Sequence, residues 1–332
     1  MTILFFSRLF WPHGGGVERH VLEVGKRLAK KGHKVTVVTE SAGNSGNIFG
    51  IHIVRHDFGG GDWFKKFRIW KWLWQHRELI KNADIVHAHD VFFWYLPFRF
   101  LYLSKPVYTT FHGYETRFPP AKKAIFWRKL SEKLSWGNIC VGDYIQKWYG
   151  TMPTYVTYGG VDVHLGGVHP ATSEVLKIML IGRFEKDIGV FQYLETLDFL
   201  KKQKIDFRFE AYGEGLLQRQ IEKYGKVYRY PKNIEEKIAG ADVVFASSYL
   251  SILSAMAARK PVIAVYTNPL KKDYLTMIPF SKFISIVDSA DKIADEVENL
   301  GKTQTRVEQA YAWAKEQTWE KVMEMYLKLW RI

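Results

Sequence analysis

The hydrophobic pattern at the start of the chain predicts a strand, a turn, a helix and a second strand. Residues 3–6 form a short apolar run. One face of a helix follows, formed by Val17, Val21, Val24 and Leu28. Gly32 ends this helix, and the apolar residues 35–38 predict the next strand. This order of elements is typical of a parallel α/β sheet.

The same alternation continues along the chain and restarts after a glycine-rich stretch. In the first part, strands are predicted at 85–88 and 107–110, with a helical segment rich in lysine and tryptophan before them. In the second part, strands are predicted at 177–181, 207–212, 243–246 and 262–265, helices at 190–200, 234–239 and 252–258, and one or two final helices at 307–329. We therefore expect two doubly wound α/β domains, at 1–162 and 174–316, with a linker at 163–173 and a ligand-binding cleft between the domains.

Composition excludes several classes of protein. The chain has 332 residues, of which 47% are hydrophobic and 25% charged, so it is neither collagen-like, coiled-coil nor mostly disordered. Its single cysteine, Cys140, excludes a disulfide framework and a cysteine-based zinc site. The longest apolar run, 91–98, is too short to span a membrane, and no secretory signal is evident. We therefore expect the protein in the cytoplasm.

Positive charge is concentrated in the first half of the chain. The net charge of the chain is +14. Residues 1–160 contain 23 basic and 11 acidic residues, whereas residues 161–332 contain 25 basic and 23 acidic residues. Nine of the 12 tryptophans also lie in the first half. Cationic and aromatic side chains in the same region predict a partner that is anionic or amphiphilic.

Three consecutive glycines, Gly14, Gly15 and Gly16, lie between the first predicted strand and its helix. Backbone without side chains can approach a phosphate closely there, and the helix N-terminus favours negative charge. An ordinary tight turn explains the same glycines. The run matches neither the P-loop nor the dinucleotide-binding fingerprint, which argues against a P-loop nucleotidase and a dinucleotide site.

Three histidines follow or end strands of the first domain. His87 and His89 share one face of a strand and could bind a metal, but no third ligand stands at a diagnostic spacing, which favours a strand-end pocket or a structural role. His112 follows the next strand and precedes a glycine, so we expect it to point into the cleft. There it could donate to a sugar hydroxyl or a phosphate oxygen, and a buried, hydrogen-bonded histidine is the alternative.

Cations and small polar residues follow the strands of the second domain. Arg183 and Lys186 come soon after its first strand, where their charges suit a diphosphate. A glycine-rich turn with Gly213 and Glu214 follows the second strand. A polar helix start after the strand at 243–246 contains the remaining candidates, Tyr249, Ser251 and Ser254. Salt bridges, plain turns and helix caps are the alternative explanations.

Taken in order, these motifs resemble glycosyltransferase family 4, over essentially the whole chain. They read GGGVERHVLEVGKRLAKKGHKVTVVT, ADIVHAHD, TTFHGYET, YGGVD, LIGRFEKDIGV, AYGEG, ADVVFASSYLSILSAMAARKPVIAV and AKEQTWEKVMEMY. The resemblance implies the GT-B fold, with two Rossmann-like domains around a cleft and a C-terminal helix, 317–332, that packs back onto the first domain. It also implies transfer of a sugar from a nucleotide diphosphate sugar with retention at the anomeric carbon, without a cofactor or an obligate metal.

The resemblance also implies roles for single residues. By position, His112 would lie near the donor sugar and Arg183 on the diphosphate. Gly15 and Gly16 would lie near the donor phosphates and the acceptor, and Glu214 near the nucleoside.

Two departures from the family bear on activity. Where the family has a lysine before a glycine, this chain has Ile188, and Lys186 is the candidate substitute. Where the family has the two carboxylates of a Glu-x7-Glu motif, this chain has Ala246 and Ser254, with a shorter loop between them. Ser254 can still bind a hydroxyl, although more weakly than a carboxylate. A divergent active enzyme, a catalytically weakened one and an engineered substitution all fit, and the shortened loop argues against the last.

Residues 62–74 predict a helix that lies on a membrane surface. Its aromatic residues form one stripe, at Trp63, Phe67, Trp70 and Trp74. Its cations lie mostly elsewhere, at Lys65, Lys66, Arg68 and Lys71. Aromatic and basic residues at 92–103 and 117–133 extend this pattern. The alternative is that the aromatic residues fill the core of the domain.

We therefore predict a transferase whose partners are a nucleotide sugar, a glycan or lipid-linked acceptor and an anionic membrane surface on the cytoplasmic side. A single-strand nucleic-acid binder is the first alternative, but no nucleic-acid-binding module is present, so no nucleic acid is expected. A sugar-nucleotide epimerase or hydrolase of the same fold is the second. A non-catalytic protein that binds sugar nucleotide or supports a partner enzyme is the third, and the missing carboxylates keep this alternative open.

Overall fold

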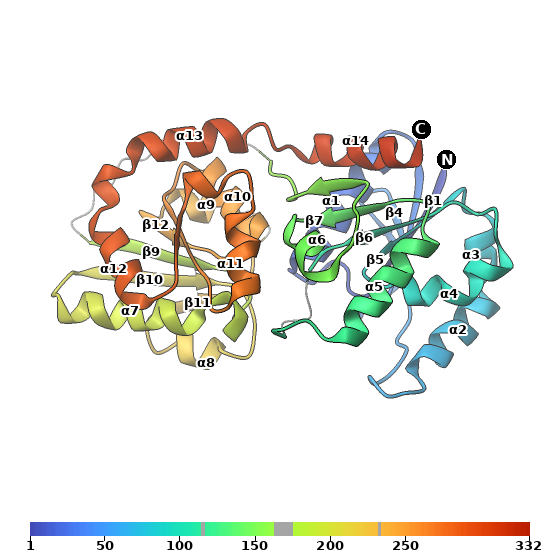
Figure 1. Cartoon of the computed structure of the whole chain (residues 1–332), viewed down its shortest axis with the longest axis horizontal. Helices are drawn as coiled ribbons and strands as arrows, with labels where there is room; N and C mark the ends of the chain where they lie inside the picture. The colour runs from blue at the N-terminus through green and yellow to red at the C-terminus, as the bar shows by residue number, and fades with distance from the viewer. Residues whose placement is uncertain (114–116, 163–174, 232–233) are drawn as a thin grey trace. The chain divides into compact units, whose positions relative to one another are not determined.

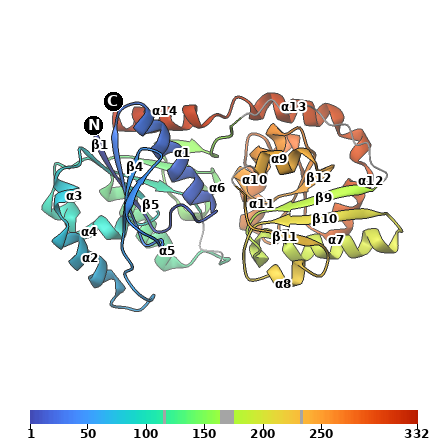
Figure 2. The same ribbon diagram turned by 180° about the vertical axis from the view of Figure 1, so that it is seen from behind.

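The chain folds into two compact units, shown from opposite sides in Figures 1 and 2. The computed structural model describes residues 1–113, 117–162, 175–231 and 234–332. Unit 1 comprises residues 1–157 and 319–332, and unit 2 comprises residues 158–318. The linker predicted at 163–173 lies outside the described residues, so it stays a prediction.

Unit 1 is built on a mostly parallel sheet. Within the part of the chain that the structure describes, the strand order is β3-β4-β2-β1-β5-β6-β7-β8, and only β3 and β4 pair antiparallel. The strands are β1 (Thr2–Ser7), β2 (Lys34–Thr39), β3 (Gly46–Ile48), β4 (Ile51–Arg55), β5 (Ile85–His89), β6 (Val107–Phe111), β7 (Asn138–Val141) and β8 (Tyr155–Thr157). The central strands β1, β5 and β6 are buried along nearly their whole length, as strands covered on both faces must be.

Helices cover both faces of this sheet. They are α1 (Gly16–Lys30), α2 (Lys65–Gln75), α3 (Glu78–Lys81), α4 (Phe92–Leu101), α5 (Lys122–Leu134), α6 (Tyr144–Tyr149) and α14 (Trp319–Trp330). Alternate residues of β1 point to opposite faces. Leu4 and Phe6 join a core cluster that includes Leu73 of α2, whereas the Phe5 ring lies 6.1 Å from the Trp330 ring of α14.

Unit 2 is built on a second parallel sheet, with the order β11-β10-β9-β12-β13-β14 among the described residues. Its strands are β9 (Leu176–Ile181), β10 (Phe207–Tyr212), β11 (Lys226–Tyr228), β12 (Val243–Phe245), β13 (Val262–Val265) and β14 (Ser285–Val287). Its helices are α7 (Val190–Lys202), α8 (Gln218–Ile221), α9 (Ile234–Ala239), α10 (Tyr249–Ala257), α11 (Pro269–Thr276), α12 (Ala290–Glu298) and α13 (Gln304–Ala314), with short 3-10 turns at Lys186–Ile188, Ser281–Phe283 and Leu300–Lys302.

The structure confirms the predicted α/β fold with two doubly wound sheets. β10, α9 and β13 have the predicted bounds. Helix α10 begins at Tyr249, three residues before its predicted start at 252, because the extended backbone of Ser248 already forms its N-cap. The final segment forms two helices, α13 and α14, and α14 belongs to unit 1, where it contacts α1.

Buried hydrogen bonds fix α14 to unit 1. Trp330 Nε1 donates to His87 Nδ1 at 3.1 Å, and His87 Nε2 lies 2.7 Å from Thr110 Oγ1. Tyr326 Oη lies 2.8 Å from Thr110 Oγ1 and 2.9 Å from His20 Nε2. We call these five residues the polar chain. It links α14 with β5, β6 and α1.

Replacing Tyr326 with phenylalanine measures how much the polar chain stabilises unit 1. The change removes the shared partner of Thr110 Oγ1 and His20 Nε2 in a buried site, so we expect the free energy of unfolding to fall by about 1–3 kcal/mol in urea denaturation. Tyr311→Phe on α13 is the control, because the Tyr311 ring contacts Arg259 through its face, 3.7 Å from the guanidinium carbon. Equal losses in the two variants would contradict the prediction.

Candidate functional site

Each sheet reverses its strand order beside the first strand of its unit. In unit 1, β1 lies between β2 and β5, and in unit 2, β9 lies between β10 and β12. Open α/β sheets bind ligands beyond the carboxyl ends of the strands at such reversal points. Several of the predicted site residues lie at the carboxyl ends of these strands: the glycines 14–16 follow β1, His89 ends β5, and Arg183 follows β9.

The glycine turn of unit 1 leads directly into α1. Gly15 is the N-cap, and a Cβ built on it would lie 2.1 Å from Glu18 Oε2. Glu18 is 9% exposed and stands in the first turn, where a carboxylate interacts favourably with the helix dipole. Gly14 and Gly16 are exposed. The turn has the predicted place, and its contact with a phosphate stays a prediction.

His112 belongs to a cluster of four histidines. His89 Nδ1 lies 3.0 Å from His112 Nε2, and the His20 ring meets the His112 ring edge-on, with centroids 4.8 Å apart. The His87 and His89 rings stack at 5.0 Å. Asp90, whose φ is +60°, accepts a hydrogen bond from the His112 backbone N–H at 3.0 Å. The left-handed backbone of Asp90 thus helps to position His112, since aspartate tolerates this conformation better than most residues.

Burial keeps these histidines neutral. It lowers the pKa of His20 to about 3 and the pKa values of His87, His89 and His112 well below the usual value, and the neighbouring rings lower those three further. An indole N–H can only donate, so the bond from Trp330 requires His87 to carry its proton on Nε2. His87 therefore donates to Thr110.

The metal site considered for His87 and His89 has no counterpart among the described residues. None of the groups of histidine, cysteine, aspartate and glutamate in that part of the chain has three or more members placed to hold a metal ion. The ring nitrogens of His87 are instead bonded to Trp330 and Thr110, and Nδ1 of His89 is bonded to His112.

In unit 2, the turns after β9 and β10 lie backbone against backbone. Gly213 has a φ of +154°, and a Cβ on it would lie 1.8 Å from the carbonyl oxygen of Gly182. A Cβ on Gly215 would lie 2.6 Å from the carbonyl oxygen of Phe184. The backbone N–H of Phe184 donates to the carbonyl of Glu214 at 2.9 Å. The turn after β10 therefore needs glycine at these two positions, because backbone of the turn after β9 occupies the space that a side chain would fill.

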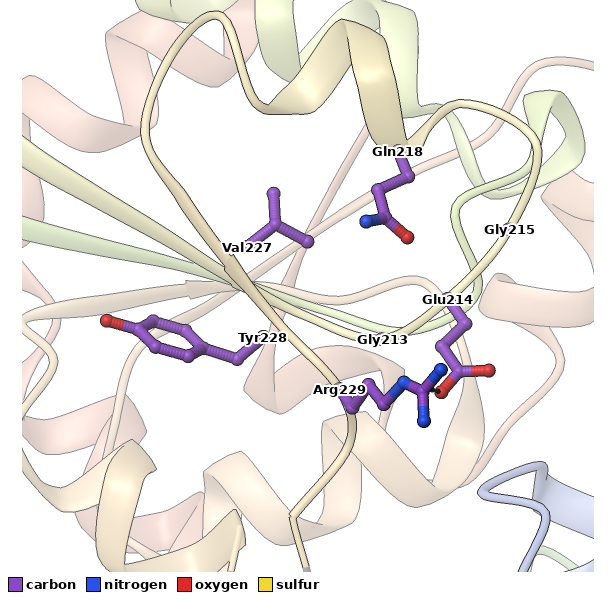
Figure 3. A pocket seen from close by; sticks show the side chains of 7 residues that line it. All are labelled: Gly213, Glu214, Gly215, Gln218, Val227, Tyr228 and Arg229. Atoms are coloured by element: carbon purple, nitrogen blue, oxygen red, sulfur yellow. Dashed lines mark ion pairs between the residues drawn. The ribbon is translucent and has the colours of Figure 1, made fainter.

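A pocket of about 360 Å³ lies beside these turns, at the carboxyl ends of β10 and β11. Figure 3 shows its lining, which is formed by Gly213, Glu214, Gly215, Gln218, Val227, Tyr228 and Arg229. The Arg229 guanidinium lies 3.5 Å from a carboxylate oxygen of Glu214. The Tyr228 ring points away from this ion pair and stacks on the ring of Tyr212 at 5.0 Å. The predicted residues Gly213 and Glu214 thus line a real pocket.

Three cations lie near the carboxyl end of β9. Arg183 is half exposed and bonded to Asp187 at 2.9 Å, and Lys186 is exposed. Lys271 of α11 is 1% exposed, and its Nζ donates to the carbonyl oxygen of Ser247 at 2.5 Å. Burial lowers the pKa of Lys271 to about 7, a net value that includes an increase from Asp187 and a smaller decrease from Arg183.

The predicted residues of α10 are buried and bonded inside unit 2. The Tyr249 ring stacks on Tyr274 at 4.0 Å, and its hydroxyl donates to the Tyr274 carbonyl at 2.8 Å. Ser251 Oγ accepts from the Ser248 hydroxyl at 3.1 Å. Ser254 is 1% exposed, and its hydroxyl donates to Glu235 Oε1 of α9 at 3.3 Å.

The aromatic stripe predicted at residues 62–74 faces outward, although the helix itself, α2, begins only at Lys65 and Trp63 lies in the turn before it. Trp63, Phe67 and Trp74 are 68%, 48% and 52% exposed, whereas Trp72 and Leu73 of the same segment pack into the core. The alternative that this stripe fills the core is therefore wrong for these three residues. The physical reason is that the core needs only one face of the helix. None of the helices within the described ranges is long and apolar enough to cross a bilayer.

The cations of this helix differ in how far they are paired. Lys65 Nζ lies 2.6 Å from Glu40, and Arg68 is bonded to Asp62 at 3.0 Å. Lys66 lies over the Trp63 ring at 3.6 Å. Trp70, the fourth aromatic residue, donates its indole N–H to the carbonyl of Phe93 at 2.9 Å. Charge on this face is thus lower than the sequence alone indicates.

Sequence reasoning missed residues that position the predicted ones. Lys271 carried a signal, because a lysine in the first turn of a helix opposes the helix dipole and needs another reason to be there. Asp90 and His20 stand within recognised motifs without a distinguishing pattern of their own. Glu235 gave no signal, since only the folded chain brings α9 against α10.

The histidine cluster makes stability depend on pH. The unfolded histidines take up protons near pH 6.5, whereas the folded ones, with lowered pKa values, do not. Stability is therefore fully present above pH 6.5 and falls below it, by up to about 1.4 kcal/mol per pH unit for each histidine. Urea unfolding between about pH 8 and pH 5 measures this slope. His20→Gln should make it shallower and the surface variant His52→Gln should not; a flat wild-type profile would contradict the assignment.

Comparison with known sequences finds a family model that matches most of the first unit. The sequence model described as Glycosyltransferase Family 4 matches residues 14–165. One component of the phosphatidylinositol N-acetylglucosaminyltransferase of Arabidopsis thaliana is 40% identical over 48 residues, which are 14% of this chain and 11% of that protein. The match thus spans about a tenth of the curated relative.

Solved structures resemble the whole chain. Anabaena HepE in complex with UDP has a TM-score of 0.73 at 15% identity, and the match covers 99% of each chain. WaaG, a glycosyltransferase involved in lipopolysaccharide biosynthesis, has a TM-score of 0.72 at 15% identity, covering 97% of this chain and 99% of WaaG. The trehalose-6-phosphate synthase OtsA has a TM-score of 0.74 at 12% identity, covering 100% and 99%. The chain therefore has the GT-B fold, and its residues 14–165 match the sequence model of glycosyltransferase family 4.

Proposed function

We propose that this protein transfers a sugar from a nucleotide diphosphate sugar to a hydroxyl acceptor, with retention at the anomeric carbon. The observation that carries the proposal is the pair of interlocked glycine turns in unit 2, with a pocket on one side and Arg183 on the next strand end. Structural neighbours solved with UDP and with UDP-glucose support a nucleotide sugar as the ligand.

The pocket suits the nucleoside. Its floor is backbone of Gly213 and Gly215, against which a flat base can lie closely. Val227 offers a small apolar surface, and Glu214, Gln218 and Arg229 offer hydrogen bonds at the rim. Uracil, guanine and adenine differ in these hydrogen bonds, so the rim would set the choice of nucleotide.

Arg183 and Lys186 suit the diphosphate. Both side chains are exposed at the carboxyl end of β9, and Arg183 can bind two phosphate oxygens at once. The N-terminus of α10, beyond the neighbouring strand β12, adds positive potential. This charge neutralises the leaving group, so the proposal needs no metal and no cofactor.

The chemistry exchanges one bond for another at the anomeric carbon. The bond from that carbon to the phosphate oxygen breaks, and a bond to the acceptor oxygen forms on the same face of the sugar. The acceptor proton passes to the leaving diphosphate, so no side-chain base is required. Neutral His112 can donate a hydrogen bond to a sugar hydroxyl, and the glycines 14–16 allow a phosphate or the acceptor to approach.

Arg183→Ala tests the donor site. Losing a charged hydrogen-bonding partner should weaken donor binding by about 10- to 100-fold in titration calorimetry. Arg208→Ala is the matched control, because Arg208 is an exposed arginine of the same unit that is bonded to Glu210. UDP-, GDP- and ADP-glucose serve as probes.

The wild-type outcomes separate the candidate functions. Binding with transfer or slow hydrolysis of the sugar supports an enzyme. Binding without any turnover over a range of acceptors would support the non-catalytic alternative, in which the chain binds sugar nucleotide or assists a partner enzyme. Failure to bind any of the three probes would overturn the proposal.

We further propose that unit 1 attaches to a membrane and receives a lipid-linked or glycan acceptor there. The support is the exposed apolar surface of three helices in contact, α2, α4 and α5. Beside the α2 stripe it includes Phe100 and Leu101 of α4 and Phe126 and Trp127 of α5, each at least 41% exposed. Tryptophan and lysine at such a surface favour the headgroup layer. The cytoplasmic side stays a prediction from the sequence.

Sedimentation with lipid vesicles tests this attachment. The wild type should pellet with vesicles that contain an anionic phospholipid and less with phosphatidylcholine alone, more so at low salt. Trp63→Ser with Trp74→Ser should reduce the bound fraction several-fold, because both indoles are exposed. Phe191→Ser with Met277→Ser, which removes exposed apolar side chains of unit 2, should leave it unchanged. Failure of the wild type to pellet at low salt would refute the attachment.

A further inference from the structure

A carboxylate reaches the buried polar side of α10 from a different helix. Ser254 lies in the second turn of α10 and is 1% exposed. Its hydroxyl donates to Glu235 Oε1 of α9 at 3.3 Å. Glu235 itself is partly exposed, so a ligand can reach it. The contact thus joins an uncharged helix to a carboxylate at the surface of unit 2.

The topology of unit 2 puts this carboxylate at the ligand-binding edge. Helix α9 leads directly into β12 and runs back along the sheet, so its first residues lie toward the carboxyl ends of the strands. Figures 1 and 2 show α9 and α10 side by side beside β12, and the two helices are in contact. β12 pairs with β9, the strand that Arg183 follows. Glu235 therefore stands near the same reversal point as Arg183.

The chemistry of this position favours a diol. Residues 249–257 of α10 contain no charged side chain, so α10 itself cannot supply an anionic acceptor. A carboxylate has two oxygens and accepts hydrogen bonds from both hydroxyls of a vicinal diol. Ribose and hexoses both carry such diols. Hydrogen bonds to a charged acceptor are about twice as strong as neutral ones, which suits a group that must orient a polar ligand.

We propose that Glu235, held by Ser254, binds a vicinal diol of the nucleotide-sugar donor. The inference rests on the proposed function and assigns to α9 the orienting carboxylate that α10 lacks. Ser254 acts as a positioning residue, because its buried hydroxyl holds one carboxylate oxygen and so sets the direction of the other.

Glu235→Gln tests the assignment with little change of shape. Titration calorimetry with UDP and UDP-glucose should show binding weakened by about 10-fold or more. Both probes are affected if the diol is that of the ribose, and only UDP-glucose is affected if it is that of the transferred sugar. Glu236→Gln, the exposed neighbour on α9, is the matched control and should bind as the wild type does. Ser254→Ala should give a smaller loss. Thermal unfolding of each variant checks that the unit stays folded.

A deletion in the ligand identifies the diol. If Glu235 holds the ribose, 2′-deoxy-UDP binds the wild type as weakly as UDP binds Glu235→Gln, and the two losses do not add. If it holds the transferred sugar, Glu235→Gln weakens UDP-glucose but not UDP. Equal binding of both probes by wild type and Glu235→Gln would overturn the inference and leave the proposed function intact, whereas no binding by the wild type would overturn the proposed function itself.

Ser254→Glu gives an independent check. A glutamate there would stand beside Glu235, and two carboxylates at such a distance repel each other. We therefore expect weaker donor binding in this variant. Stronger binding would mean that position 254, and not Glu235, is where the donor needs its carboxylate, and would overturn the inference.

Discussion

The hydrogen bonds between α14 and the centre of unit 1 hold the chain's two ends in one structure. Tyr326 lies 306 residues from His20 and 216 from Thr110 in the sequence, yet its hydroxyl contacts both. These polar atoms are buried, so each would cost free energy if left without a partner. The cost makes docking of α14 specific. An apolar helix could slide on the sheet, whereas Tyr326 and Trp330 find their hydrogen-bond partners in only one position of the helix.

Burial determines the protonation state of the candidate site in unit 1. A histidine cluster with this little exposure is stable only when uncharged, so its members act as neutral donors and acceptors. His112 is joined to this cluster through His89 and is positioned through its backbone by Asp90. The packing of α14 and the protonation state of His112 therefore both involve the same buried histidine cluster. In unit 2, glycines fix the geometry of the candidate site, since the turns after β9 and β10 can touch only where no side chain stands between them.

The fold followed from local patterns, and the site followed from them only in part. Alternating apolar segments and glycine turns predicted the two sheets, because buried parallel strands must be apolar on both faces. The short antiparallel pair β3 and β4 was not predicted, since β3 is largely exposed and carries no apolar run. Gly213, Glu214 and Arg183 were found because they follow strands directly. Lys271 and Glu235 were not, because their roles depend on contacts between elements that the sequence pattern does not join.

Whether a carboxylate can bind a ligand depends on its position in the folded chain and not on its position in a sequence motif. What a diol requires is two oxygens at hydrogen-bonding distance from its hydroxyls, in an orientation that the protein holds before the ligand arrives. A motif on one helix meets this requirement in one way. In this chain the loop that enters α10 is short and position 254 is a buried serine, which leaves the space beside α10 to a side chain from α9. Absence of the motif's carboxylates therefore does not by itself imply absence of their function, because neighbouring helices at the edge of a sheet offer their side chains to the same volume.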